Sequence, residues 1–219
     1  IKHLVIDEMQ DYSRMQYLIL AKLFPCKMTI LGDKAQTMDE KMQDVTRFLP
    51  KILGKDIRII QMNKSYRNTV EIAEYAGKLA GMTDMELFER HGKPVEEKKI
   101  VNREEALEKI LQNLKLGEEE YETAAVLTMT QEEAGKIYRQ LKEKLGEEYS
   151  ISYVDRDSSS FQKGITVTTF YLAKGLEFDQ VFAVFPQKDR SPLVRQARYI
   201  AATRAVSYTH LTLPTNSRV

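Results

Sequence analysis

Short apolar runs alternate along this chain with stretches whose apolar residues recur at helical spacing. The runs predict strands over residues 1–6, 27–31, 57–62, 123–129, 149–154, 165–170, 181–185 and 208–213. The helical spacing predicts helices over residues 12–24, 69–80, 103–116, 130–146 and 191–206. Because strands and helices alternate, the pattern indicates an α/β protein built on a parallel sheet.

Capping and turn residues mark the ends of several of these elements. Pro25 ends the first helix, and Gly117 and Gly146 each follow a helix. Capping-box patterns at residues 68–71 and 130–133 mark two helix starts. The pair Ser191-Pro192 places a serine at the N-cap and a proline at the first position of the last helix.

Three segments carry no predicted strand or helix. Residues 34–50 are polar, with Phe48 and Leu49 as their expected anchors. Residues 82–99 are expected to form a loop, and residues 155–163 a polar loop rich in serine.

Composition narrows the class of protein. The chain has 219 residues, of which 42% are hydrophobic and 30% charged, as in soluble globular proteins with one large or two small domains. No apolar run approaches the roughly 20 residues that cross a bilayer, so we expect no membrane partner. The single Cys26 is expected to be a reduced thiol in a cytoplasmic protein. With a net charge of +1, a nucleic-acid partner would require a local basic groove.

The start of the chain carries the first candidate chemistry. The apolar run at residues 4–6 predicts a strand buried on both faces, and Asp7 and Glu8 follow it directly. Ligands of open α/β sheets bind at the carboxyl ends of the strands. One carboxylate there can hold Mg²⁺, and its neighbour can activate a water that attacks a phosphate. The alternative is a pair of ordinary acidic turn residues.

Two further motifs follow predicted strands. The stretch 32–36 (GDKAQ) ends in Gln36, whose amide can sense a terminal phosphate; the alternative is a common Gly-Asp turn. In Ser65-Tyr66-Arg67, the arginine offers a bidentate grip on phosphate and the tyrosine a face for stacking. That arginine could equally form a surface ion pair.

Two more motifs lie near the end of the chain. Residues 169–179 (TFYLAKGLEFD) place a lysine, a glycine and a glutamate close together, and the glycine permits close approach of a backbone or a phosphate. An ordinary loop is the alternative. Residues 198–205 (RYIAATRA) put Arg204 about two turns beyond Arg198 on the last predicted helix, where an arginine is usually at the surface.

Taken together and in this order, these stretches resemble motifs II, III, IV, V and VI of a superfamily 1 helicase of the UvrD/Rep type. The resemblance extends from Val5 to Ala205. Within that group, residues 171–179 look most like the HelD branch, whose members act on RNA polymerase. The resemblance implies an ATP-dependent DNA helicase that couples hydrolysis, with ATP and Mg²⁺ bound, to movement on single-stranded DNA.

The resemblance also implies roles for residues of the first motifs. Asp7 would coordinate Mg²⁺, and Glu8 would polarise the attacking water. Gln10 and Gln36 would sense the γ-phosphate and couple its loss to movement.

The later motifs would supply the remaining groups. Arg67 and Arg204 would be arginine fingers, and Tyr66 would lie near the adenine. Glu177 would contact the nucleotide sugar, with the Gly175 backbone close by. The track for nucleic acid would be formed by Thr169, Tyr171 and Lys174.

The resemblance implies a RecA-like (P-loop NTPase) parallel sheet flanked by helices. Residues 1–62 would be the C-terminal part of a first motor domain, and residues 63–213 the second motor domain. Residues 214–219 would be a tail of uncertain origin. Because the chain opens directly on a core strand, we expect it to be cut from a longer protein that holds the missing N-terminal half of the first motor domain.

The sequence departs from the helicase pattern in three ways. It contains no Gly-x-x-x-x-Gly-Lys-Ser/Thr loop, so the chain alone is expected to lack ATPase activity. Thr37-Met38-Asp39 replaces the aromatic residues that usually stack on bases, and Tyr171 replaces the usual histidine of motif V. The interval between motifs IV and V is too short for the accessory domain of UvrD-type enzymes.

These departures leave alternative functions open. The chain could belong to a HelD-like ATPase that acts on RNA polymerase. It could also be a non-catalytic RecA-like module that binds another protein. The set of polar groups directed at one phosphate favours an enzyme.

Overall fold

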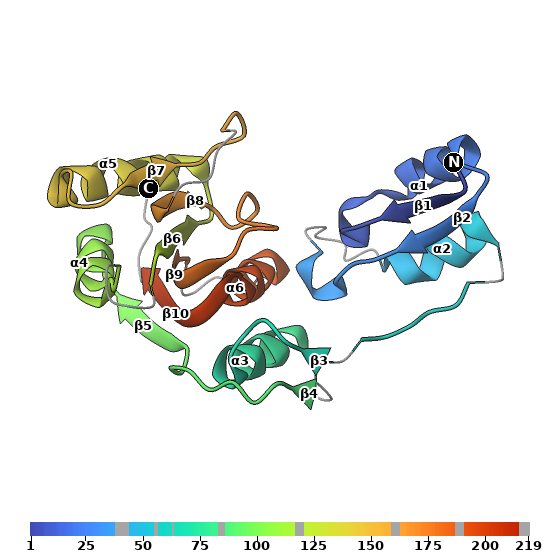
Figure 1. Ribbon diagram of the computed structural model, residues 1–219. Helices are drawn as coiled ribbons and strands as arrows, with labels where there is room; N and C mark the ends of the chain where they lie inside the picture. Colours follow the sequence, from blue (N-terminus) through green and yellow to red (C-terminus); the bar gives the residue numbers. More distant parts are fainter. Residues whose placement is uncertain are drawn as a thin grey trace. The chain divides into compact units, whose positions relative to one another are not determined.

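The computed structural model describes residues 1–37, 44–54, 57–62, 64–82, 86–116, 121–158, 163–186 and 191–214. For residues 207–214 the description is limited to the backbone. Contacts divide the chain into two units, Ile1–Met62 and Asn63–Val219, which are described separately (Figure 1).

The first unit is a small α/β arrangement around one parallel strand pair. Strands β1 (His3–Ile6) and β2 (Lys27–Ile30) pair in parallel, and helices α1 (Arg14–Leu23) and α2 (Val45–Leu53) complete the unit. The short 3-10 helices η1 (Met9–Asp11) and η2 (Lys34–Gln36) follow the two strands. The buried core consists of Ile6, Tyr17, Val45 and Leu49.

The strand pair of this unit is less buried than the sequence predicts. The prediction that β1 is covered on both faces is wrong, since Val5 is 61% exposed while Ile6 is 4% exposed. The same holds for α1, where Met15, Ile19 and Leu23 are exposed and Tyr17 faces the core. The physical reason is that the described part of this sheet has two strands, which leaves one face of the pair and part of α1 without a covering layer.

One further prediction fails in the first unit. Residues 57–62 form no strand, and Ile59, Ile60 and Met62 are exposed, because no described strand lies beside them to pair. The segment 34–50, for which the sequence predicts no helix, contains the start of α2. Its N-cap Asp44 accepts a hydrogen bond from the Thr46 N–H (3.0 Å), and Leu49 is buried as expected.

The second unit is built on a six-stranded parallel sheet with the order β5-β10-β9-β6-β8-β7. Its strands are β5 (Glu96–Ile100), β6 (Thr123–Thr128), β7 (Ile151–Tyr153), β8 (Gly164–Thr169), β9 (Phe178–Val184) and β10 (Ala205–Pro214). Its helices are α3 (Val70–Ala80), α4 (Arg103–Asn113), α5 (Gln131–Leu145) and α6 (Pro192–Arg204).

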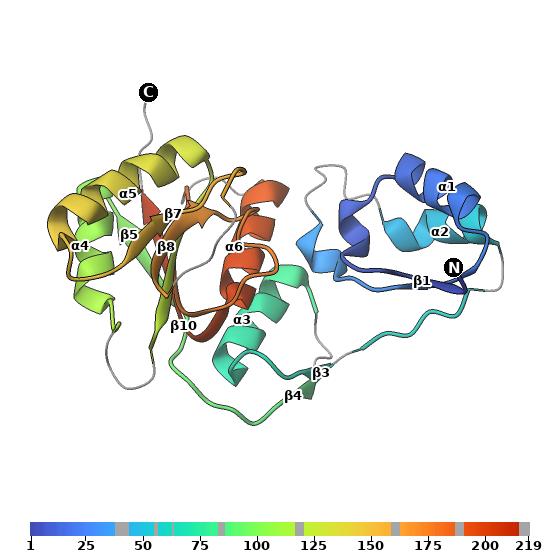
Figure 2. The ribbon, with the colours of Figure 1, turned by 45° about the horizontal axis from the view of Figure 1, so that its top comes forward.

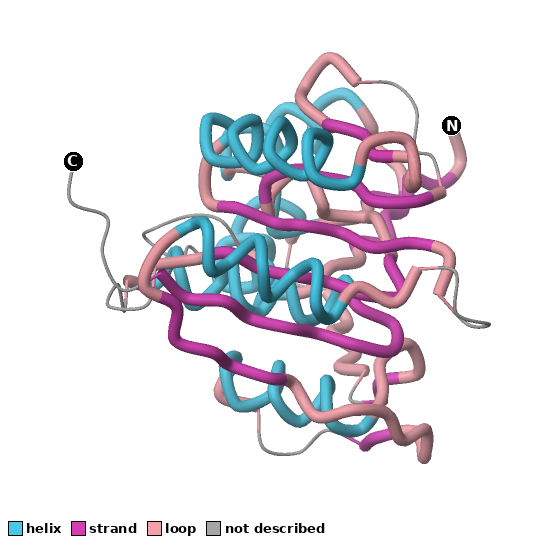
Figure 3. Tube along the Cα trace, turned by 90° about the vertical axis from the view of Figure 1, so that its left-hand side faces the viewer, coloured by secondary structure: helices cyan, strands magenta, loops and turns pink. Residues whose placement is uncertain are grey.

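Helices cover both faces of this sheet. Helices α4 and α5 lie on one face, and α6, backed by α3, lies on the other (Figures 1 and 2). Figure 3 shows the strands in magenta with helices in cyan stacked against them. The central strand β6 is buried almost throughout, with Ala124, Val126 and Leu127 fully inaccessible. This arrangement confirms the predicted α/β class with a parallel sheet flanked by helices.

Most element predictions in this unit are confirmed, and one segment is corrected. The segment 82–99, expected to be a loop, contains β4 (Glu86–Leu87) and most of β5. Strand β4 pairs with β3 (Lys64–Ser65) in a separate two-stranded sheet. Strand β5 lies at the edge of the main sheet, where its charged sequence EEKKI carries no alternating apolar signal. Gly117 and the tail beyond Pro214 lie outside the described residues.

The connection between β8 and β9 is unusually short. The two strands are parallel and flank β6, so residues 170–177 must pass from the carboxyl edge of the sheet back to its amino edge. Such crossovers usually take a dozen or more residues. Here the path is held by backbone hydrogen bonds, from Phe170 N to Thr128 O (3.1 Å) and from Leu176 N to Ala173 O (3.1 Å).

Gly164 is expected to be essential for the fold of the second unit. It has a φ of 112°, and a Cβ built there would lie 2.2 Å from the Ser150 carbonyl oxygen. Gly164→Ala is therefore expected to lower the free energy of unfolding by about 2 kcal/mol or more, measured by urea denaturation.

Gly135→Ala is the matched control for this measurement. A Cβ at Gly135 would meet only the Tyr153 hydroxyl, at 4.0 Å, inside helix α5. We expect this change to be stabilising by up to about 1 kcal/mol, because alanine favours a helix interior. Equal stability of Gly164→Ala and the unmodified protein would contradict the prediction.

Candidate functional site

The two predicted carboxylates of the first unit follow β1 in a strained turn. Asp7 is exposed, and its Oδ1 accepts a hydrogen bond from the Glu8 N–H (2.8 Å). Glu8 has φ 51° and ψ 50°, and no other non-glycine residue in the described part of the chain has a positive φ. Such a left-handed conformation is costly for a glutamate, and strained backbone of this kind concentrates at functional sites.

A chain of hydrogen bonds brings three predicted site residues together. The Gln10 Nε2 donates to Glu8 Oε2 (2.5 Å), and the Gln10 Oε1 accepts from the Asp33 N–H (3.1 Å). Asp33 Oδ2 in turn accepts from Gln36 Nε2 (3.0 Å). Glu8, Gln10 and Gln36 therefore belong to one network, which we call the carboxylate network.

Two members of this region were not identified as site residues from the sequence. Asp33 links the two glutamines and also accepts from the Ala35 N–H (2.9 Å). Gly32 allows the two segments to approach, since a Cβ there would lie 2.5 Å from Gln10 Oε1. The Gly-Asp pair was visible in the sequence, where it has the ordinary interpretation of a turn.

Gln36 holds a buried atom that lacks a partner. The residue is 9% exposed, and its Oε1 has no hydrogen-bond partner among the residues that the structure describes. Leaving such an acceptor buried and unsatisfied costs free energy, so a donor from a ligand or water would be stabilised there. The carboxylate network therefore fits a bound group with donor and cationic character.

The chemistry of these side chains fits Mg²⁺ only when a ligand brings oxygens of its own. The described residues contain no group of three or more His, Cys, Asp or Glu side chains that could hold a metal ion. Mg²⁺ is commonly bound through one or two carboxylates together with phosphate and water oxygens. Asp7, exposed at the end of β1, could be such a single carboxylate.

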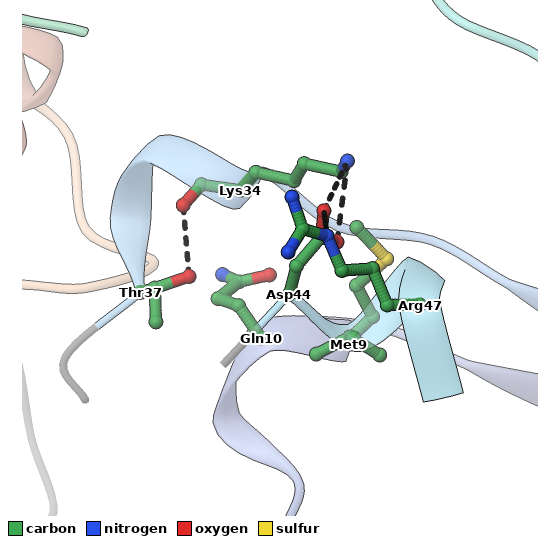
Figure 4. Close-up of a pocket in the computed structure, with 7 residues that line it drawn as sticks. Met9, Gln10, Lys34, Thr37, Asp44 and Arg47 are labelled. Atoms are coloured by element: carbon green, nitrogen blue, oxygen red, sulfur yellow. Dashed lines mark hydrogen bonds and ion pairs between the residues drawn. The ribbon is translucent and has the colours of Figure 1, made fainter. Parts of the chain in front are cut away.

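A cavity of about 280 Å³ borders this network (Figure 4). Gln10 and Met9 line it together with Lys34, Thr37, Asp44, Val45 and Arg47. Lys34 and Arg47 both form ion pairs with Asp44, at 3.3 and 3.6 Å. The cavity is therefore lined by side chains of both charges. Of the carboxylate network, Gln10 lines it, whereas Glu8 does not, and neither does Asp7.

In the second unit, the two predicted arginines meet at one loop. Arg67 Nε forms an ion pair with Glu177 Oε1 at 2.8 Å, and Arg204 Nη1 donates to the carbonyl oxygen of Leu176 at 3.4 Å. Leu176 and Glu177 are adjacent, so both arginines are bound to the same short segment after Gly175, whose φ is 78°. We call Arg67, Gly175, Glu177 and Arg204 the arginine cluster.

The arginines differ in their exposure. The side chains of Arg67 and Glu177 are 49% and 48% exposed, whereas Arg204 is 3% exposed. A guanidinium this deeply buried near the end of a helix is expensive to desolvate and is rare without a structural or functional reason. The exposed pair can exchange partners with a ligand at little cost, because surface ion pairs contribute about 0–1 kcal/mol.

Asn68 joins the two segments that carry these arginines. Its buried Nδ2 donates to the carbonyl oxygens of Ala205 (2.7 Å) and Thr203 (3.5 Å), which flank Arg204. The predicted capping box at 68–71 is wrong, since Thr69 is the N-cap of α3 and the Asn68 side chain is used elsewhere. Its role depends on a contact between residues far apart in the chain, for which the sequence offers no signal.

The remaining predicted residues of this unit are not members of the arginine cluster. Thr169 is fully buried at the carboxyl end of β8, and no described residue is a hydrogen-bond partner of its Oγ1. Tyr171 is half-buried with its ring edge-on to Phe170, at a centroid distance of 5.6 Å. Lys174 is half-buried within the connection 170–177, while Tyr66 is 65% exposed directly before Arg67.

Glu71 fastens the loop that follows β4 to the start of α3. Its carboxylate accepts from the Gly92 N–H (2.8 Å) and lies 3.0 Å from His91 Nδ1. Hydrogen bonds from its own backbone N–H and from Gly92 lower the pKa of Glu71 to about 2, from an ordinary value of 4.5.

This shift predicts a pH-dependent contribution to stability. Because the pKa is lower in the folded state, the contribution of Glu71 is complete above about pH 4.5 and is lost as the pH falls towards 2. The Tm of Glu71→Gln should therefore lie below that of the unmodified protein at pH 6, and the two should converge near pH 2. Glu74→Gln, an exposed change on the same helix, is the control; a constant difference in Tm across this range would refute the assignment.

Comparisons with known proteins found proteins of similar structure but none of matching sequence. No protein-family profile matches the chain, and no curated protein sequence matches it. The C-terminal domain of a possible DNA helicase from Lactobacillus plantarum WCFS1 is similar in structure, with a TM-score of 0.55 and 22% identity. That similarity covers 68% of this chain and 88% of the other.

Two viral structures are similar over nearly the whole chain. Arterivirus nonstructural protein 10, a helicase solved with DNA, has a TM-score of 0.53 and 13% identity over 96% of this chain. The helicase of PRRSV has a TM-score of 0.51 and 16% identity over 97% of this chain. This chain spans only 39% and 35% of those two viral chains.

At these identities the similarity defines the fold. With the parallel sheet and its two helical layers, it establishes a RecA-like α/β fold of the kind found in helicase structures. Among the helices of the described residues, none has the length and apolar character needed to span a bilayer.

Proposed function

We propose that this chain is part of an ATP-driven superfamily 1 helicase or translocase of the UvrD/Rep type. In this proposal, residues 1–62 belong to the first motor domain and the second unit is the second motor domain. The observation that carries the proposal is the arginine cluster, in which Arg67 and Arg204 contact the adjacent residues Leu176 and Glu177. Sequence motifs far apart along the chain thus meet at one place.

The arginine cluster suits the terminal phosphates of a nucleotide. Guanidinium groups bind phosphate oxygens in a bidentate manner and neutralise the charge that develops during phosphoryl transfer. Arg67 is held by Glu177 in a half-exposed ion pair, which phosphate oxygens can replace. Glu177, once released, could accept hydrogen bonds from ribose hydroxyls, and the exposed Gly175 has no Cβ to obstruct their approach.

The carboxylate network suits the activation of water. Asp7 would hold Mg²⁺, and bound Mg·ATP would supply the electrophilic phosphorus and the leaving group. The Glu8 carboxylate would orient a water and accept its proton, while the Gln10 amide fixes that carboxylate through its hydrogen bond to Oε2. Gln36 would respond to the presence of the γ-phosphate through its amide group, whose Nε2 donates to Asp33 Oδ2 in the structure.

Nucleic acid is the proposed track. Thr169, Tyr171 and Lys174 belong to the strand end and connection that lead directly to Gly175 and Glu177, so binding of a strand would act on the segment that contacts both arginines. One structural neighbour is a helicase solved with DNA, which supports DNA as the partner. The sequence of residues 171–179 also supports a HelD-like ATPase that acts on RNA polymerase bound to DNA.

A non-catalytic module that binds another protein is the alternative. It would need neither the strained Glu8 backbone nor a buried Gln36 acceptor without a partner. The present sequence lacks a Gly-x-x-x-x-Gly-Lys-Ser/Thr loop. Once a segment with such a loop completes the chain, a helicase is expected to hydrolyse ATP, whereas a non-catalytic module is not.

The test is a complementation assay. The chain is co-expressed with the loop-bearing segment of a superfamily 1 helicase, and ATP hydrolysis is measured with and without single-stranded DNA. We expect hydrolysis stimulated by DNA in the complemented protein and none from the chain alone. Assembly of the two segments without any hydrolysis would support the non-catalytic module.

A further inference from the structure

The junction at which α6 ends and β10 begins is irregular. Ala205 of β10 pairs with Phe178 of β9, and the next paired residue of β10 is Tyr208, which lies opposite Gln180. β10 therefore advances three residues where β9 advances two, which is a β-bulge. The bulge directly follows Arg204. Bulges interrupt the ladder and redirect nearby side chains, so the backbone around this arginine depends on other contacts for its direction.

Two side chains from the region around α3 supply those contacts. Asn68 Nδ2 donates to the carbonyl oxygens of Ala205 (2.7 Å) and Thr203 (3.5 Å). Arg90 Nη2 donates to the carbonyl oxygen of Val206 (2.6 Å). The bound carbonyl groups lie on both sides of the buried arginine at the end of α6. We call Asn68 and Arg90 the carbonyl clamp.

The carbonyl clamp is itself fixed to the start of α3. The carbonyl oxygen of Arg90 accepts from the Val70 N–H (2.9 Å), two residues after Asn68. On the other side of Arg90, the Glu71 carboxylate accepts from the Gly92 N–H (2.8 Å) and fastens the loop to the same helix. Asn68 is 9% exposed, so water competes little for its hydrogen bonds. The two donors therefore reach the bulge from one rigid frame.

A hydrogen bond of the same kind in α4 shows a purely structural role. Asn113 Nδ2 donates to the carbonyl oxygen of Lys109 (2.8 Å) in the last turn of that helix. Helix α4 lies on the opposite face of the main sheet from α6 (Figures 1 and 2). Both asparagines thus stabilise a helix end through a side-chain amide, but only Asn68 does so beside a member of the arginine cluster.

We propose that Asn68 and Arg90 are positioning residues for Arg204. The proposal rests on the proposed function, in which the Arg204 guanidinium acts on the phosphates of the nucleotide. By holding the carbonyl groups on both sides of Arg204, the carbonyl clamp sets the direction in which this side chain leaves the backbone towards the Leu176 carbonyl oxygen, 3.4 Å from Nη1. Such preorganisation favours the transition state, because no reorganisation is needed at the moment of reaction.

The carbonyl clamp also relates the two arginines to each other. Asn68 directly follows Arg67, and its side chain binds the backbone next to Arg204. The backbones that carry the two guanidinium groups are therefore joined by a single side chain, independently of the contacts that the guanidinium groups make. The sequence assigned no role to Asn68 or Arg90, because both act on carbonyl groups more than a hundred residues away.

The first experiment measures the position of Arg204 directly, by ¹H–¹⁵N NMR of its Nε–H in the full 219-residue chain. The signal is assigned by its loss in Arg204→Lys. Arg90→Met keeps the aliphatic stem but removes the donors, and Asn68→Asp keeps the shape but replaces the donor by an acceptor. We expect each change to shift and broaden the Arg204 signal. Arg90→Lys retains a cationic donor and should restore the signal, and Asn113→Ala, the matched control, should leave it unaltered.

The second experiment measures turnover in the complemented protein with saturating single-stranded DNA. Arg90→Met and Asn68→Asp should lower kcat about tenfold to a hundredfold, with the KM for ATP near its normal value, because a misplaced group is lost from the transition state. Arg90→Lys should recover most of the turnover. Asn113→Ala should lower the Tm by a similar amount without lowering kcat, which separates positioning from stability.

The possible outcomes separate this proposal from the proposed function. An Arg204 signal that neither Arg90→Met nor Asn68→Asp alters overturns the proposal, even where the complemented protein hydrolyses ATP. Hydrolysis with a normal kcat in both variants also overturns it and leaves the carbonyl clamp with a structural role. An altered signal that Arg90→Lys restores supports the positioning of Arg204, and it does so even if the complemented protein shows no hydrolysis and the proposed function fails.

Discussion

Arg204→Ala is expected to reduce DNA-stimulated ATP hydrolysis by about a thousandfold or more in the complemented protein. Arg204 lies at the end of α6, is almost completely buried, and contacts the carbonyl oxygen of Leu176 beside Glu177. An arginine that stabilises the charge of the transition state acts on turnover, so kcat should fall much more than the affinity for ATP. Steady-state kinetics at saturating DNA measure both.

Two further variants make this result specific to the guanidinium. Arg204→Lys keeps a cation but loses the planar fork, and we expect it to remain severely impaired. Arg195→Ala removes an exposed arginine from the same helix and should retain normal hydrolysis. Because Arg204 is buried, thermal unfolding of each variant establishes that the fold is intact. Folded Arg204→Ala with turnover within about tenfold of the unmodified protein would exclude its role as an arginine finger.

Glu8→Gln is expected to lower turnover by about a hundredfold to ten-thousandfold while ATP still binds. The substitution keeps the shape of the side chain and its ability to accept from Gln10 Nε2, but the amide cannot take a proton from water. Binding of ATP with little hydrolysis is therefore the expected signature. Single-turnover kinetics in the complemented protein separate the chemical step from binding.

Asp11→Asn is the matched acidic control, since Asp11 is exposed in the short helix η1 that follows Glu8. It should leave turnover near normal. If the chain alone hydrolysed ATP and Glu8→Gln abolished that activity, the chain would not require an additional phosphate-binding segment. Equal turnover of Glu8→Gln and the unmodified protein would remove Glu8 from the mechanism.

The main sheet of the second unit was predictable because its central strands are buried on both faces. β6, β8 and residues 181–184 of β9 are runs of apolar or β-branched residues, which the sequence pattern identifies directly. The starts of α5 and α6 were equally clear, because Thr130 and Ser191 accept hydrogen bonds from Glu133 N (3.2 Å) and Val194 N (3.3 Å).

The predictions that failed share one physical cause. The local sequence pattern does not indicate which strands or helices lie beside a segment in the fold. The edge strand β5 is charged, and it is placed in the sheet by its pairing with β10. Residues 57–62 are apolar enough for a strand but have no strand beside them in the described structure. In α1, the spacing of apolar residues predicted the helix but not the face that is buried, which depends on the layer that covers it.

The sequence predicted the candidate site as a set of separate motifs. The contacts between those motifs became visible only in the structure. Resemblance to helicases singled out Glu8, Gln10, Gln36, Arg67 and Arg204. The residues that join them, Asp33 and Asn68, act through single contacts to distant backbone or amide groups.

The short connection between β8 and β9 has a mechanical consequence. Residues 170–177 cover the full height of the sheet, about 20 Å for strands of this length. At about 3.4 Å per residue these eight residues could span about 27 Å, so the spare length is about 7 Å, held in the turn that the hydrogen bond from Leu176 N to Ala173 O closes. We therefore expect a displacement of Tyr171 at one edge to reach Gly175 and Glu177 at the other only once that turn opens.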